Sequence, residues 1–132
     1  MSTETISLLV DDEKVVLESL RDQVRRLFGE AIECETAESA DEAWEVLDEV
    51  MEQDANRVIL VVSDWLMPRI KGDEFLERVR DRYPSISRVL LTGQADQAAL
   101  DRIESMQLVD RLLFKPWKTE ELREMVDAAL ER

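Results

Sequence analysis

VILVVSDWLMP, residues 58–68, places five apolar residues before Ser63 and the carboxylate of Asp64, and the segment closes at Pro68. A continuous Val/Ile/Leu run of this length is typical of a strand buried on both faces, as the central strands of parallel sheets are. Open α/β sheets bind their ligands at the carboxyl ends of such strands. The segment therefore predicts a central strand with Asp64 at its functional end.

Composition narrows the classes of function that this chain can have. The 132 residues suit one domain with its own core, and the formal charge of −14 argues against nucleic acid as a direct partner. The absence of histidine excludes His-based acid/base catalysis and most zinc sites. The polar N-terminus lacks a secretory pattern, no apolar run is long enough to span a membrane, and the single cysteine, Cys34, suits a reducing compartment. We therefore expect a cytoplasmic protein without membrane contact.

Strand-like and helix-like patterns alternate along the chain. Short apolar segments predict strands at 6–10, 32–36, 58–62, 89–92 and 112–114. Apolar residues at helical spacing follow each one, in segments 16–27, 43–51, 75–79, 99–106 and 122–130, and the third of these helices must end before Pro84. Five such units predict a parallel sheet covered by helices on both faces. Because 32–36 alternates like an edge strand, we expect a (βα)5 doubly wound sheet with the flavodoxin-like order 2-1-3-4-5.

Several residues mark the expected helix ends. Ser39 and Glu42 form a capping-box pattern before the second helix, and Gly29 stands where the first helix should stop. Thr119 is the expected N-cap of the last helix, and Leu130 is expected to face the core with the other apolar residues of that helix.

Four polar side chains follow strand ends at regular intervals. Asp12, Asp64, Thr92 and Lys115 are separated by 52, 28 and 23 residues, which matches two, one and one units of about 25 residues each. We therefore expect these residues, with Asp11, to meet at one edge of the sheet. Carboxylates forced together raise one another's pKa unless a cation intervenes, and an open all-oxygen site suits Mg²⁺. A nearby ammonium and hydroxyl would complete a cradle for a phosphoryl group.

The motifs LLVDDE (8–13), SDWLMP (63–68), LLTG (90–93) and FKP (114–116) together resemble the receiver domain of two-component response regulators. The resemblance spans nearly the whole chain, so residues 1–132 are read as a single receiver domain, either standing alone or forming the N-terminal part of a longer regulator. It implies that Asp64 is the phosphoacceptor, a nucleophile that forms an aspartyl phosphate. It also implies Mg²⁺ as cofactor, bound by Asp12, by Asp64 and by the backbone carbonyl of Leu66, with Asp11 acting through water.

The same resemblance assigns the remaining site residues. Lys115 would pair with the phosphoryl oxygens, and Thr92 would swing its hydroxyl onto the phosphoryl group. The Lys115–Pro116 bond would be cis. Leu66 and Gln94 would flank the phosphoryl group and tune its lifetime. Receivers often carry an aromatic residue three positions before the lysine, whereas this chain has Leu112 there, so the usual aromatic coupling route is in doubt.

The resemblance implies a switch that assists its own phosphorylation and dephosphorylation rather than an enzyme. A sensor histidine kinase or phosphotransfer protein would donate the phosphoryl group, and the surface around the fourth helix, fifth strand and fifth helix would change. That face is also a candidate homodimer interface, and a fused or separate output domain would read the switch.

Two alternatives remain open. A Mg²⁺-dependent phosphohydrolase with an aspartyl-phosphate intermediate would commonly carry Asp-x-Asp at one strand end, whereas Asp11 and Asp12 are adjacent. A degenerate receiver serving only as a protein-binding scaffold is disfavoured because the acids, Thr92 and Lys115 are all present.

Overall fold

The computed structural model of the protein describes residues 5–54, 57–93 and 96–131. Strands and helices alternate along the chain in the predicted order, with a short 3₁₀ helix between α1 and β2. The elements are β1 (Thr5–Val10), α1 (Lys14–Phe28), η1 (Gly29–Ala31), β2 (Ile32–Ala37), α2 (Ala40–Gln53), β3 (Val58–Asp64), α3 (Gly72–Arg82), β4 (Ser87–Thr92), α4 (Gln97–Ser105), β5 (Arg111–Phe114) and α5 (Thr119–Leu130). Gln94, to which the sequence assigns a role near the phosphoryl group, lies outside the described residues.

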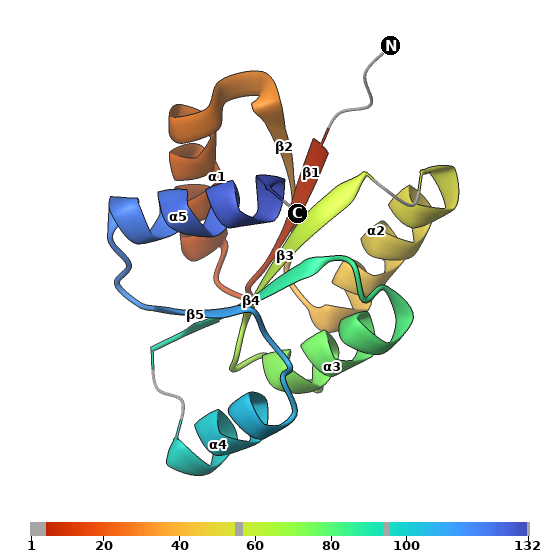
Figure 1. The fold of residues 1–132 in the computed structure, drawn as a ribbon, viewed down its shortest axis with the longest axis vertical. Helices are drawn as coiled ribbons and strands as arrows, with labels where there is room; N and C mark the ends of the chain where they lie inside the picture. The colour runs from red at the N-terminus through yellow and green to blue at the C-terminus, as the bar shows by residue number, and fades with distance from the viewer. Residues whose placement is uncertain (1–4, 55–56, 94–95, 132) are drawn as a thin grey trace.

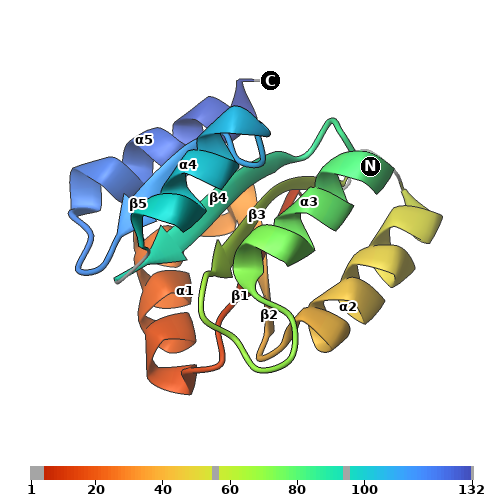
Figure 2. The same ribbon diagram turned by 90° about the horizontal axis from the view of Figure 1, so that it is seen from below.

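The sheet confirms the predicted topology: five parallel strands lie in the order β2-β1-β3-β4-β5. Figures 1 and 2 show α1 and α5 on one face and α2, α3 and α4 on the other. Val61 packs with α2 and α3, whereas Leu60 and Val62 pack with α1 and α5. The unbroken apolar run of β3 follows from these two cores, because both faces of the strand are covered.

Helix starts follow local polar chemistry, with one correction. Ser39 caps α2 as predicted, since its hydroxyl accepts a hydrogen bond from the Glu42 backbone N–H at 3.1 Å. Thr119 is not the cap of α5 but its first helical residue. The cap is Lys118, whose backbone N–H donates to Glu121 Oε1 at 2.9 Å, so the side-chain contact at this helix start is made by the glutamate in the first turn and not by a threonine hydroxyl.

The last turn of α5 corrects a second expectation. Leu130 is 41% exposed and does not face the core. Ala129, the residue before it, is buried, and one residue further along a helix turns the side chain by about 100° away from the buried stripe. Similarly, α4 ends at Ser105, and Met106, which the apolar pattern included in this helix, follows it with a partly exposed side chain.

Among the described residues, no helix is both long enough and apolar enough to cross a membrane.

Candidate functional site

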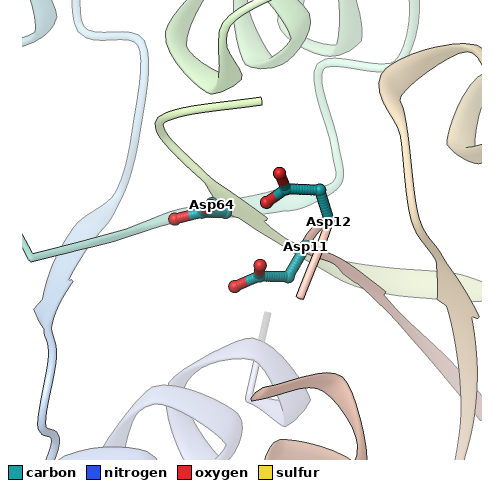
Figure 3. A group of neighbouring side chains, drawn as sticks. All are labelled: Asp11, Asp12 and Asp64. Carbon is teal, nitrogen blue, oxygen red and sulfur yellow. The ribbon is translucent and has the colours of Figure 1, made fainter. Parts of the chain in front are cut away.

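Two neighbouring strands bring three carboxylates together. Val10 pairs with Ser63, so Asp11 and Asp12, which follow β1, lie beside Asp64 at the end of β3. One carboxylate oxygen from each residue can be chosen so that all lie within 4.8 Å of one another, and Figure 3 shows the three side chains converging. We call Asp11, Asp12 and Asp64 the acid cluster.

The members of the acid cluster differ in exposure. Asp11 is fully buried and Asp64 is 5% exposed, whereas Asp12 is exposed to solvent. The Asp11 carboxylate is held in place because its Oδ1 accepts a hydrogen bond from the Glu13 backbone N–H at 2.8 Å. The cluster is therefore closed on the side of the sheet and open on the side of Asp12, where water or a ligand can enter.

Lys115 links the two buried carboxylates. Thr92 pairs with Phe114, and the Lys115 backbone N–H donates to the Thr92 carbonyl at 2.9 Å, which carries the lysine to the same edge of the sheet. Its Nζ donates to Asp11 Oδ2 and to Asp64 Oδ1, both at 3.1 Å. The Lys115–Pro116 bond is cis, as the resemblance implied.

Burial controls the pKa values of the two buried carboxylates. It is the main cause that raises the pKa of Asp64 from its ordinary 3.8 to about 6; the charge of Asp11 adds to the rise and Lys115 opposes it. Burial likewise raises the pKa of Asp11, with the Glu13 and Lys115 hydrogen bonds opposing. Burial on its own would lower the pKa of Lys115, but the hydrogen bonds to Asp64 and Asp11 raise it. One ammonium thus leaves the carboxylates under-compensated, a condition that a divalent cation at the cluster would relieve.

The remaining predicted residues lie around this centre. Thr92 ends β4 and is buried; Asp64 pairs with Leu91, so Thr92 lies one residue beyond the partner of Asp64. Leu66 lies two residues beyond Asp64 in the β3–α3 loop, with 48% of its side chain exposed. Leu112 is partly buried and packs on the core beneath α2, α3 and α4.

Two residues that hold the Asp64 backbone were not identified from the sequence as site residues. The Ser63 hydroxyl donates to the Asp64 carbonyl at 3.0 Å. Gly72 begins α3 directly against the same carbonyl: a Cβ at this position would lie 2.0 Å from the Asp64 oxygen. Its backbone N–H donates to the Trp65 carbonyl at 2.8 Å. The sequence feature that could have predicted this close approach is a lone glycine at a helix start, a few residues after a functional carboxylate.

Trp65 reports on the same backbone. The side chain is 6% exposed and packs in the core, and the Lys71 Nζ lies 5.4 Å from the centre of its ring. Trp65 directly follows Asp64, so its fluorescence should respond to changes at the acid cluster.

A parallel sheet of this order, with an acid cluster and a lysine at its carboxyl edge, defines the class of receiver-like α/β domains. The family model described as the response regulator receiver domain matches residues 7–127. The chain therefore belongs to the response regulator receiver domain family of two-component signalling.

Individual relatives agree with this assignment. The chain is similar to response regulator Rre1 of Synechocystis sp. (35% identity, 98% of this chain and 53% of the relative) and to the hydrogenase transcriptional regulatory protein HoxA of Cupriavidus necator (32% identity, 94% and 24%). Its fold is similar to the signal receiver domain of an HD domain-containing protein from Pseudomonas fluorescens Pf-5, with a TM-score of 0.84 at 30% identity over 97% of this chain and 95% of that one. The chain thus spans about a quarter to a half of these curated relatives.

Proposed function

We propose that this receiver accepts a phosphoryl group on Asp64 in a Mg²⁺-dependent reaction and thereby acts as a switch. A sensor histidine kinase or a phosphotransfer protein would be the donor. The observation that carries the proposal is the lysine bridge: Lys115 Nζ lies 3.1 Å from both Asp11 and Asp64, next to the exposed carboxylate of Asp12. A phosphoryl group on Asp64 would find an ammonium on one side and an open acidic face on the other.

The donor set fits Mg²⁺. All the groups available are oxygens, and the exposed side of the cluster leaves room for the water that Mg²⁺ retains. Asp12, Asp64 and the Leu66 carbonyl would hold the ion, and Asp11 would act through water. When bound, Mg²⁺ would supply positive charge to neutralise the phosphoryl oxygens during transfer.

The chain's own groups account for the transfer. A carboxylate oxygen of Asp64 forms the new P–O bond while the P–N bond to the donor's histidine breaks, and the donor nitrogen keeps the electron pair. Lys115 already points at Asp64 and would transfer its hydrogen bond to a phosphoryl oxygen. The Thr92 hydroxyl would then bind the phosphoryl group from β4. In these respects the domain would assist its own phosphorylation. In dephosphorylation, water would attack the phosphorus, the P–O bond to Asp64 would break, and inorganic phosphate and the free carboxylate would be released, so no further substrate is involved.

The output of the switch would lie on the face formed by α4, β5 and α5. The chain matches only part of each of the longer relatives, which supports a further domain as the part that responds to the switch. The same face remains our candidate for homodimer formation, and residues 1–132 our candidate for one complete receiver domain.

Intact-mass measurement after incubation with Mg²⁺ and acetyl phosphate tests the proposal. We expect the wild-type protein to gain one phosphoryl group, the Asp64→Asn variant to gain none, and the exposed control Asp127→Asn to behave as wild type. Omitting Mg²⁺ should abolish the gain. Repeated turnover on an external phosphoester would instead support a phosphohydrolase, and no modification of the wild-type protein would support a scaffold.

A further inference from the structure

Helix α4 is held more loosely in the core than the helices around it. It buries one residue, Ile103, whereas α3 buries five and α5 buries four. A hollow of about 850 Å³ lies beside it, lined by Leu100, Ile103 and Met106 and by Leu112 of β5. The fold therefore leaves α4 room to change position relative to β5.

Polar links to α3 hold α4 instead. Arg102 of α4 donates from Nη1 to Asp73 Oδ2 at 2.8 Å and from Nη2 to Glu77 Oε2 at 3.0 Å. The two carboxylates lie one turn apart on α3, so a single guanidinium spans both. We call these contacts the Arg102 bridge. Its acceptor side chains are only 12% and 25% exposed, which limits screening by water and salt.

The start of α3, where Asp73 lies, is fixed to the phosphoacceptor strand. Gly72, the residue before Asp73, packs against the Asp64 carbonyl so closely that no Cβ fits between them, and its N–H bonds the Trp65 carbonyl. A change in the backbone at Asp64 or Trp65 must therefore displace the start of α3. Asp73 moves with it, and Asp73 is one end of the Arg102 bridge.

We propose that the Arg102 bridge couples the acid cluster to α4, in place of the aromatic route that Leu112 does not provide. The inference rests on the proposed function, since it describes how a change at Asp64 reaches the output face. We use the word loading for phosphorylation of Asp64 or for the binding of Mg²⁺ and beryllofluoride in its place. Loading the cluster shifts the first turn of α3, the bridge transmits that shift, and α4 takes a new position over the hollow. The element with two positions is α4, and both the cluster and any partner of α4 bias it.

Hydrogen exchange with and without Mg²⁺ and beryllofluoride tests the coupling. In the wild-type protein, we expect loading to change the exchange rates of the α4 amides. In Arg102→Ala, these amides should exchange at least about tenfold faster before loading, and loading should no longer change them. By thermodynamic reciprocity, the affinity for beryllofluoride should also change, by about fivefold or more. Glu77→Gln removes the negative charge of one of the two acceptors and leaves the acid cluster intact, so it should shift both readouts in the same direction by less.

Arg78→Ala is the matched control, because it removes an exposed arginine that pairs within α3, with Glu74, and leaves α4 alone. It should behave as wild type. The inference is overturned if Arg102→Ala, shown to be folded by circular dichroism, keeps the wild-type response of α4 and the wild-type affinity. If the wild-type protein does not bind beryllofluoride, the proposed function itself fails and the coupling falls with it.

Discussion

Replacing Asp64 by asparagine should stabilise the folded protein at neutral pH. The fold raises the pKa of this carboxyl from 3.8 to about 6, so the folded state holds more protons than the unfolded state between those values. Stability must therefore fall as pH rises from about 4 to 6, and it stays lowered above that range. The difference corresponds to about 3 kcal/mol at pH 7, at about 1.4 kcal/mol for each pH unit. Asparagine, which does not ionise, is free of this cost.

Urea unfolding of the wild-type protein and of Asp64→Asn, from pH 4 to 8 in the presence of a chelator, measures the effect. The variant's advantage should grow from near zero at pH 4 to about 3 kcal/mol at pH 8, or roughly 10 °C in melting temperature. The exposed control Asp127→Asn should stay within about 0.5 kcal/mol at every pH. A difference that does not depend on pH, or a variant less stable than wild type at pH 8, would refute the reasoning.

A metal titration provides an independent arm of the same experiment. Binding of Mg²⁺ to the folded state should stabilise the wild-type protein by about 2.7 kcal/mol when the ion is at a hundred times its dissociation constant. The Asp64→Asn variant should gain less, because it has lost one of the proposed ligands. The stability of the two proteins should therefore converge as Mg²⁺ is added at pH 8.

Three other changes test the surroundings of the cluster. Gly72→Ala should lower the free energy of unfolding by about 2 to 4 kcal/mol, because its Cβ would overlap the Asp64 carbonyl. Gly93→Ala, whose Cβ would meet nothing nearer than 3.8 Å, should lower it by less than about 1 kcal/mol, and urea unfolding compares the two variants. Lys115→Met should raise the pKa of Asp64 above about 6, seen as a shift of the pH–stability profile to higher pH, and an unchanged profile would contradict the bridge. Trp65→Phe should remove most of the fluorescence change on adding Mg²⁺ and beryllofluoride; a full response in that variant would assign the signal to another tryptophan.

Much of the fold was accessible from hydrophobic patterns. The strands of the sheet are short apolar runs, and the pattern of continuous and alternating runs fitted the order 2-1-3-4-5 without determining it. The start of β4 was less accessible, because the strand begins with Ser87 and Arg88, two buried polar residues. The Arg88 guanidinium is accommodated there by donating to the carbonyls of Ile86 and Leu108, and only folding brings Leu108 close to it.

The site was predictable to the extent that spacing controls it. Regular strand-to-strand intervals place Asp11, Asp12, Asp64 and Lys115 at one edge, and the structure brings these four together. Spacing could not show that Lys115 is shared between two buried carboxylates, since that depends on side-chain reach. Spacing also could not predict the Arg102 bridge, because the contact between α3 and α4 depends on how the two helices lie side by side.

The strand order also makes the site depend on both ends of the chain. Asp11 and Asp64 follow or end β1 and β3, whereas the ammonium that they share, that of Lys115, lies 51 residues after Asp64, beyond β5. A chain that ended before β5 would contain both buried carboxylates and lack the cation that compensates their burial. The last strand is therefore needed for the electrostatic balance of the first and third.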